Sequence, residues 1–233
     1  MTRSSWVRLG LYEARRAGIE ALVAVPVTLV AGAAMVIVTA VGGRDVHSVA
    51  GTVLEAVLPL AAGLAASSIL DVDPLVELQL SLPTSYRVTA TRRVLCVLGL
   101  AALFSVAAAS GASGTGLWTS SHGAVAIVFI WLAPTLALAG LALVLSVGFQ
   151  STPLAAGVVA TLWIGEQSFK GWFASHSVTR ALYLFAETRP GVVPATAWAP
   201  NRLTLTAVGL VAFGVAWHSL SDRDRLLNTG GHA

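Results

Sequence analysis

Six long apolar stretches separated by short polar connections constrain this chain more than any other feature. They run over residues 18–41, 50–70, 94–111, 123–149, 153–169 and 203–220. A helix needs about 20 apolar residues to cross the hydrocarbon core of a bilayer. Only 11% of the residues are charged, whereas soluble domains carry about 25%. The sequence therefore predicts an all-α polytopic membrane protein with about six transmembrane helices, folded as a single transmembrane domain over residues 1–233.

The basic residues are scattered between these stretches and carry topological information. All but one of the 14 are arginines, and they form no basic stripe that could follow a nucleic-acid backbone. Cytoplasmic segments of membrane proteins are enriched in lysine and arginine. With the N-terminus inside, nine of the 14 lie inside and five outside, so we expect a multi-pass plasma-membrane protein with both termini cytoplasmic. The inside set is Arg3, Arg8, Arg15, Arg16, Arg87, Arg92, Arg93, Arg223 and Arg225, and the outside set is Arg44, Lys170, Arg180, Arg189 and Arg202.

Residues 1–17 combine Trp6, Leu9 and Leu11 with four arginines. Such a mixture is typical of an amphipathic helix lying in the headgroup layer, acting either as a topology anchor or as a contact for a cytoplasmic partner. No small-residue cleavage site follows a short apolar core, so we expect the first apolar stretch to be a retained membrane span.

Several kinds of chemistry have no matching pattern in the sequence. The single cysteine, Cys96, allows neither an intramolecular disulfide nor a cysteine metal cluster. The single lysine, Lys170, is not part of a phosphate-binding loop. No set of residues typical of a membrane hydrolase or transferase is present. We therefore predict no catalytic, cofactor-binding or metal-binding residue, and an intramembrane enzyme is the least favoured function.

Three carboxylates near the ends of the apolar stretches suggest an alternative function. A carboxylate inside a membrane is costly and is often functional, so a proton-coupled secondary transporter could use Glu55 or Glu166. These two residues and Glu20 are all placed close to a predicted interface, however. We expect their side chains to reach water there.

The connection over residues 71–93 has its own helix signals. Asp73 is a good N-cap, Pro74 suits a first helical turn, and Pro83 would end the helix. The residues VELQLSL also alternate with a period of two, so periodicity alone allows a strand. A lone exposed strand would leave its edges unpaired, which favours a short amphipathic helix. Its apolar face would carry Leu75, Leu78 and Leu82.

Two segments resemble the membrane subunits of type-2 ATP-binding-cassette exporters. The first has the acidic residue, leucine-rich stretch and SLP-S-R pattern that follow the second helix of those permeases. The second, NRLTLTAVGLVAFGVAWHSLSDRDRLL at residues 201–227, is similar to their last helix with its charged ERLL ending, although Asp224 replaces the usual glutamate. Tyr86 stands where arginine or serine is commoner. The residues of the first segment are Glu77, Leu78, Leu80, Ser81, Leu82, Pro83, Ser85, Tyr86 and Arg87.

The resemblance implies a transport function for the chain. It would be a permease subunit that moves a hydrophobic or amphipathic substrate outward, paired with a second copy or a related permease. A separate ATPase subunit would bind ATP and magnesium, so this chain itself needs no cofactor. The cytoplasmic coupling helix between the second and third spans would dock in a groove of that ATPase. The predicted coupling residues are Asp73, Leu75, Glu77, Leu78, Leu82, Pro83, Tyr86 and Arg87.

The segment before the last span has two interpretations. In the resembled exporters, the equivalent segment forms short helices that dip back from the outer face. An ordinary loop carrying interfacial aromatic residues would have a similar composition. The aromatic residues concerned are Trp172, Phe173, Tyr183, Phe185 and Trp198.

Overall fold

The computed structural model describes residues 19–43, 45–69, 86–116, 118, 122–189 and 191–220. No β-strand occurs among these residues, and their regular structure is helical. The elements are α2 (Ile19–Val41), α3 (Val46–Thr52), the π-helical turn η1 (Val53–Val57), α4 (Leu58–Ser68), α6 (Tyr86–Gly114), α7 (Ala124–Phe149), α8 (Thr152–Ser168), α9 (Lys170–Ser175), α10 (Ser177–Ala181) and α11 (Ala195–Ser219).

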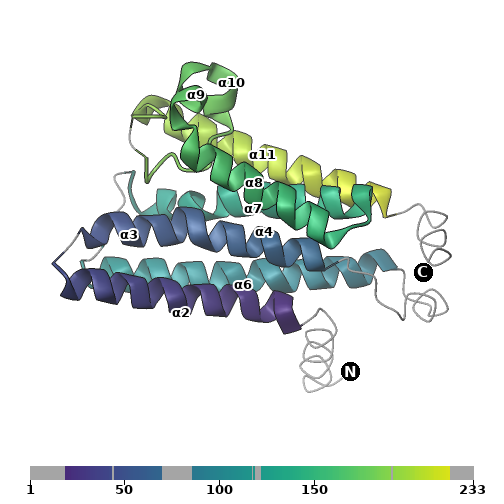
Figure 1. The fold of residues 1–233 in the computed structure, drawn as a ribbon, viewed down its shortest axis with the longest axis horizontal. Coiled ribbons are helices and arrows are strands. Elements are labelled where there is room, and N and C mark those ends of the chain that lie inside the picture. Colours follow the sequence, from purple (N-terminus) through teal and green to yellow (C-terminus); the bar gives the residue numbers. More distant parts are fainter. Residues whose placement is uncertain are drawn as a thin grey trace.

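The long helices form an antiparallel bundle, in which α3, η1 and α4 follow one another as one continuous helix (Figure 1). The start of α2, the end of α11 and the connection between α7 and α8 lie at one end, on the right in Figure 1. We call this the terminal end. The connection between α2 and α3 lies at the opposite end, together with α9 and α10, and we call it the α9–α10 end.

Within the described part of the chain, five helices are long and apolar enough to cross a membrane, which confirms the all-α polytopic fold class. The remaining predicted stretch forms α8, which has 17 residues and runs back along α7 (Figure 1). Its length lies at the lower limit of about 17–25 residues for a membrane-spanning helix. The five candidate spans are Val23–Val41, Val46–Ser68, Ala90–Gly114, Ala126–Phe149 and Ala195–Ser219.

The predicted boundaries match α2, α7 and α8 to within one residue. The helix formed by α3, η1 and α4 begins at Val46 instead of residue 50, and α6 and α11 are longer than predicted by a wider margin. Helix α6 begins at Tyr86 instead of residue 94, and it continues to Gly114 through a stretch expected to be an outer connection. Helix α11 begins at Ala195 instead of Leu203. Hydropathy marks where a chain meets hydrocarbon, whereas backbone hydrogen bonds continue a helix through polar residues such as Asn201. The apolar stretches therefore predict too short a length for both α6 and α11.

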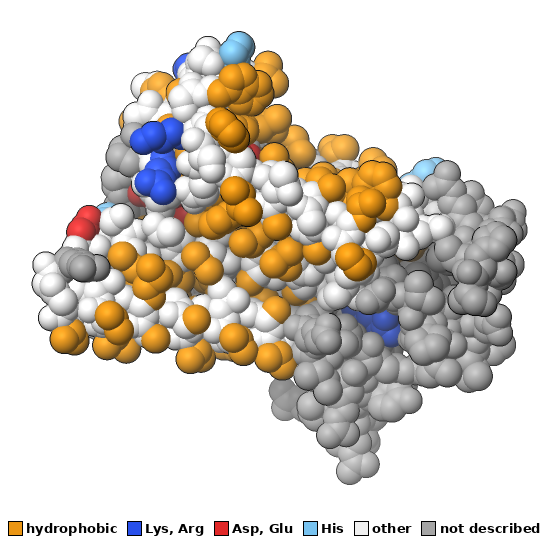
Figure 2. Space-filling model, viewed as in Figure 1, with side chains coloured by type: hydrophobic (Ala, Val, Ile, Leu, Met, Phe, Trp, Pro, Cys, Tyr) orange, Lys and Arg blue, Asp and Glu red, His pale blue; other side chains and the backbone are white. Residues whose placement is uncertain are grey.

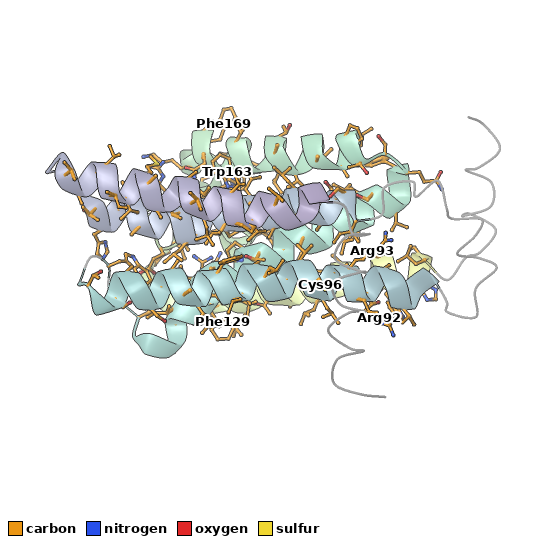
Figure 3. The ribbon with its side chains drawn as sticks, turned by 90° about the horizontal axis from the view of Figure 1, so that it is seen from below. Arg92, Arg93, Cys96, Phe129, Trp163 and Phe169 are labelled. Carbon is orange, nitrogen blue, oxygen red and sulfur yellow. The ribbon has the colours of Figure 1, made fainter. Side chains whose placement is uncertain are left out.

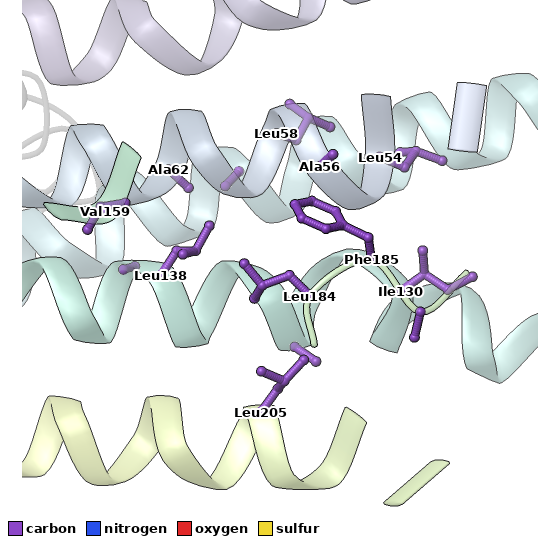
Figure 4. Close-up of a cluster of buried hydrophobic side chains, with 14 of the residues drawn as sticks. Leu54, Ala56, Leu58, Ala62, Ile130, Leu138, Val159, Leu184, Phe185 and Leu205 are labelled. Atoms are coloured by element: carbon purple, nitrogen blue, oxygen red, sulfur yellow. The ribbon is translucent and has the colours of Figure 1, made fainter. Parts of the chain in front are cut away.

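Small side chains bring the central helices α4, α7 and α11 close together. Gly63 of α4 faces Leu138 of α7, and Gly140 of α7 faces Gly209 of α11. Such contacts allow the close helix packing that membrane bundles require. Figure 4 shows the apolar core between these helices, including Leu54, Leu58 and Ile130, which are at most 2% exposed.

The outer surface of the bundle is strongly apolar. Val30 and Val38 of α2 are each 71% exposed, and Val41 is 85% exposed. Figure 2 shows hydrophobic side chains spread over this flank, with much of the visible charge toward the α9–α10 end. Single exposed apolar residues are common in soluble proteins, but a continuous apolar flank indicates contact with lipid. The predicted interface helix over residues 1–17 lies outside the described residues.

Candidate functional site

A buried ion pair joins the second and last spans. Glu55 lies in η1, and Arg202 lies in the N-terminal half of α11. The Nη2 atom of Arg202 donates to Oε1 of Glu55, and the two side chains are 1% and 0% exposed. Burying two charges is costly unless their remaining polar atoms are also hydrogen-bonded. The neighbours of this pair therefore determine whether it is stable.

The π-helical turn that carries Glu55 has a local cause. Pro59 follows four residues later, in the first turn of α4. Proline has no N–H to donate, and its ring crowds the carbonyl group four residues earlier, which here belongs to Glu55. A local widening of the helix relieves this crowding, and such π-bulges are frequent at functional sites. The widened turn also leaves the Ala56 carbonyl to accept a hydrogen bond from Trp163 Nε1 at 3.0 Å.

Glu55 and Arg202 hold a non-helical segment inside the bundle. We call residues 182–189 the buried segment, because Tyr183, Leu184 and Phe185 are at most 2% exposed. The backbone N–H groups of Glu187 and Thr188 donate to the Glu55 carboxylate at 2.8 and 2.6 Å. Arg202 Nη1 donates to the Leu184 carbonyl at 3.0 Å. Irregular backbone is tolerated in a membrane protein where the protein itself supplies such partners.

Two further polar side chains fix the same segment. Glu166, from the last turn of α8, accepts a hydrogen bond from the Leu184 N–H at 2.7 Å. Asn201, next to Arg202 on α11, donates through Nδ2 to the carbonyls of Arg180, Ala181 and Tyr183 at 3.0, 3.1 and 2.9 Å. Four side chains from three helices thus provide hydrogen-bond partners for the backbone of the buried segment and of the two residues before it.

Aromatic contacts fill the space around these hydrogen bonds. Figure 4 shows Leu184 and Phe185 on a stretch that passes between α7, α11 and the helix formed by η1 and α4. The Phe185 ring meets Trp163 edge-on at 5.7 Å and meets Tyr183 at the same distance.

The connection between α6 and α7 closes the network at the α9–α10 end. His122 Nδ1 lies 3.1 Å from Oε2 of Glu187, and the His122 ring stacks on Trp198 with centroids 4.3 Å apart. The guanidinium of Arg202 lies over the same Trp198 ring, 5.6 Å from its centroid. The contacts therefore form a closed loop that passes from His122 through Trp198, Arg202 and Glu55 back to Glu187.

The burial of Glu55 and Glu166 corrects the expectation that their side chains reach water. Their exposed fractions are 0% and 2%. The physical reason is the buried segment, which covers both carboxylates and replaces water with backbone N–H donors. The side chain of Glu20 lies outside the described residues. Both carboxylates are thus enclosed within the bundle, together with the guanidinium of Arg202.

Arg202 does not belong with the outer topology charges, where we expected it. It lies inside α11 and is 1% exposed, because its charge is compensated by Glu55. Sequence reasoning also gave no role to Asn201. The available signals were the spacing between Glu55 and Pro59 and the pair Asn201–Arg202 inside an otherwise apolar helix. Neither signal identifies the partner across the bundle.

The predicted ATPase-coupling residues are largely outside the described part of the chain. Asp73, Leu75, Glu77, Leu78, Leu82 and Pro83 fall in the gap between residues 69 and 86. The backbones of Tyr86 and Arg87 form the first turn of α6, at the terminal end. The coupling helix therefore stays a prediction.

The segment before the last span does contain short helices. Helices α9 and α10 form at the end of the bundle, and the chain then returns between the long helices as the buried segment (Figure 1). The aromatic residues divide accordingly, since Trp172 is 56% exposed and Phe185 is fully buried. Among the described residues, no group of three His, Cys, Asp or Glu side chains is placed to bind a metal ion.

Comparison of the chain with protein-family models, curated proteins and solved structures found no match.

Proposed function

We propose that this chain is the membrane-spanning subunit of an ATP-binding-cassette exporter. It moves a hydrophobic or amphipathic substrate outward, and a separate ATPase subunit binds ATP and magnesium and supplies the energy. One observation carries the proposal. The antiparallel bundle begins and ends at the same end, and short helices with a buried segment precede its last helix at the opposite end. The resemblance to those permeases implies the same layout, with both termini on one side and short helices before the last span on the other.

The terminal end is then the cytoplasmic end. Arg92 and Arg93 lie there, in the first turns of α6 (Figure 3). Lys170, Arg180 and Arg189 belong to the opposite half of the molecule. Removing the two buried arginines, Arg202 from the outside set and Arg93 from the inside set, changes the charge count from nine against five to eight against four. The excess of basic residues at the terminal end is unchanged and still favours cytoplasmic termini.

Coupling to the ATPase would pass through the connection between α4 and α6. Helix α4 packs in the centre of the bundle, against α7 and α8, whereas α6 lies toward its side. A helix over residues 73–83 docked in an ATPase groove would move both helices when two ATPase subunits close. Two permease halves would thereby change between inward-open and outward-open forms. No catalytic step is assigned to this chain.

The proposal is tested by copurification with candidate ATPases, followed by substrate-stimulated ATP hydrolysis. The double variant Leu78→Asp/Leu82→Asp should insert normally but lose the ATPase, because it places unpaired charges in an apolar groove. The matched control Val76→Asp/Leu80→Asp adds the same charge, with the same spacing, on the other side of the predicted helix and should retain binding. Unimpaired ATPase binding and export in the first variant would refute the coupling role.

The buried carboxylates favour proton-coupled transport as the second candidate. Glu166 is the better proton carrier, because Glu55 is already paired with Arg202. Proteoliposomes containing this chain alone would then transport substrate along a pH gradient, and Glu166→Gln would abolish that transport. Export that requires the ATPase and survives Glu166→Gln would instead support the exporter.

A further inference from the structure

An apolar groove runs along the outside of the bundle near the terminal end. Its volume is about 380 Å³, and α6, α7 and α11 form it. One wall comes from α6 and the other from α11, with Leu136 and Leu143 of α7 between them. The lining residues are Ala90, Thr91, Val94, Leu95, Leu98, Leu136, Leu143, Leu210, Phe213, Gly214, Ala216, Trp217 and Leu220.

The groove follows from the helical repeat of its walls. Residues 91, 94, 95 and 98 of α6 have the spacing i, i+3, i+4 and i+7, and residues 210, 213, 214 and 217 of α11 have the same spacing. Each set therefore forms one straight stripe along its helix. Two parallel apolar stripes over a leucine floor make a long and narrow channel, which suits a linear hydrocarbon chain.

The groove is open toward the surroundings of the bundle. Leu95 is 62% exposed, Leu210 is 57% exposed and Trp217 is 43% exposed. At Gly214 the channel is especially roomy, because a side-chain carbon added there would meet no heavy atom within 4 Å. An occupant can thus enter from the membrane without displacing the core.

A positive charge lies at the same end of the groove. Arg92 follows Thr91 and lies one helical turn before Leu95, and its side chain is exposed. Figure 3 shows Arg92 and Arg93 projecting from different sides of α6, so that Arg92 lies outside the bundle. Trp217 lies on the opposite wall, and indole rings favour the level of the headgroups. An apolar channel with a guanidinium beside it is complementary to an anionic amphiphile.

We propose that this groove binds one anionic phospholipid from the membrane leaflet at the terminal end. One acyl chain lies between α6 and α11, and the headgroup phosphate lies beside Arg92. Lipid binding at this site requires neither an ATPase nor export, so its test is independent of the proposed function. Because lipid tails are as apolar as leucine, the acyl chain is held by close packing and the headgroup by charge.

The packing arm of the test compares two glycines. Gly214→Phe fills the groove, whereas Gly99→Phe places the same ring on a part of α6 that is also open within 4 Å but does not line the groove. The purified proteins are exposed to phosphatidylglycerol in detergent, and bound lipid is counted by native mass spectrometry. We expect roughly tenfold lower retention for Gly214→Phe, because the ring takes the space of the chain, and wild-type retention for Gly99→Phe.

The charge arm compares phosphatidylglycerol with phosphatidylcholine. Wild type and Arg92→Lys should prefer the anionic lipid roughly fivefold, as expected for one basic residue at a membrane surface, and Arg92→Gln should lose the preference. Equal retention by both glycine variants would overturn the acyl-chain site. An unchanged lipid preference in Arg92→Gln would overturn the headgroup contact. A change of oligomeric state without lipid loss in Gly214→Phe would assign the groove to a second copy of the chain.

Discussion

At the scale of single residues, the Glu55–Arg202 pair is the feature with the strongest energetic consequences. The pair is buried, and most of its remaining polar atoms are hydrogen-bonded to the backbone of Leu184, Glu187 and Thr188, whereas Nε of Arg202 has no hydrogen-bond partner among the described residues. A buried ion pair contributes little net stability against a well-packed apolar alternative, but breaking it by removing one partner is strongly destabilising. The pair therefore specifies where the buried segment lies more than it adds to total stability.

We predict that Glu55→Gln lowers thermal stability more than Arg202→Gln. The first variant leaves a buried guanidinium, which cannot lose its charge, and the loss should be about 3–5 kcal/mol. The second leaves a carboxyl group that can take up a proton and keeps its two backbone donors. The double variant should lose less than the sum of the two, because its amides can bond to each other. Thermal unfolding in detergent measures all three, and additive losses would contradict the pairing.

At the scale of elements, the crossing of α7 and α11 depends on two glycines. A carbon added to Gly209 would lie 2.6 Å from the carbonyl carbon of Leu136, and one added to Gly140 would lie 2.7 Å from the Gly209 carbonyl oxygen. The neighbouring atoms are backbone, so no side chain can move aside. The helices can keep their present distance only with glycine at both positions.

We predict that Gly209→Ala separates α7 from α11 and destabilises the protein by about 1–3 kcal/mol, the range for overpacking a dense core. Gly214→Ala on the same helix is the matched control, because its added carbon meets no heavy atom within 4 Å. The control should be as stable as wild type or slightly more so, since alanine favours helix. Thermal unfolding of both variants tests this prediction. Equal stability of the two variants would mean that α7 and α11 pack less closely than the structure shows.

At the scale of the whole molecule, the orientation of the bundle is open to a direct test. Thr115 lies at the α9–α10 end and Gln150 at the terminal end, and both are exposed. In a Cys96→Ala background, Thr115→Cys should react with a membrane-impermeant thiol reagent in intact cells. Gln150→Cys should react only after the membrane is opened. The reverse pattern would place the terminal end outside and would exclude the proposed contact with a cytoplasmic ATPase.

The number of permease chains in the complex is also a property of the whole molecule. A single bundle supplies half of a pathway in the resembled exporters, so we predict a complex with two permease chains, either two copies or one copy with a related permease. Native mass spectrometry of the detergent-extracted complex gives the stoichiometry. An active complex in liposomes with one permease and one ATPase would contradict this prediction.

The sequence by itself determined the fold class and most helix positions. Hydropathy identifies the segments that lie in the hydrocarbon of the membrane. Unpaired backbone N–H and C=O groups are too costly there, and the helix is the local structure that pairs them all. The ends of α2, α7 and α8 therefore follow from the apolar stretches. The starts of α6 and α11 do not, because these helices continue beyond the apolar stretches. The exporter resemblance also came from the sequence, and its coupling residues stay predictions.

Only the tertiary structure decided what the polar residues do. Glu55 and Arg202 are 147 residues apart, and nothing local to either residue identifies the other. The same applies to Glu166 and Leu184, which meet only because the chain after α10 turns back into the bundle. A buried charge needs a partner, and this requirement can be read from one residue. The partner's identity depends on how the helices pack, which is a property of the whole bundle.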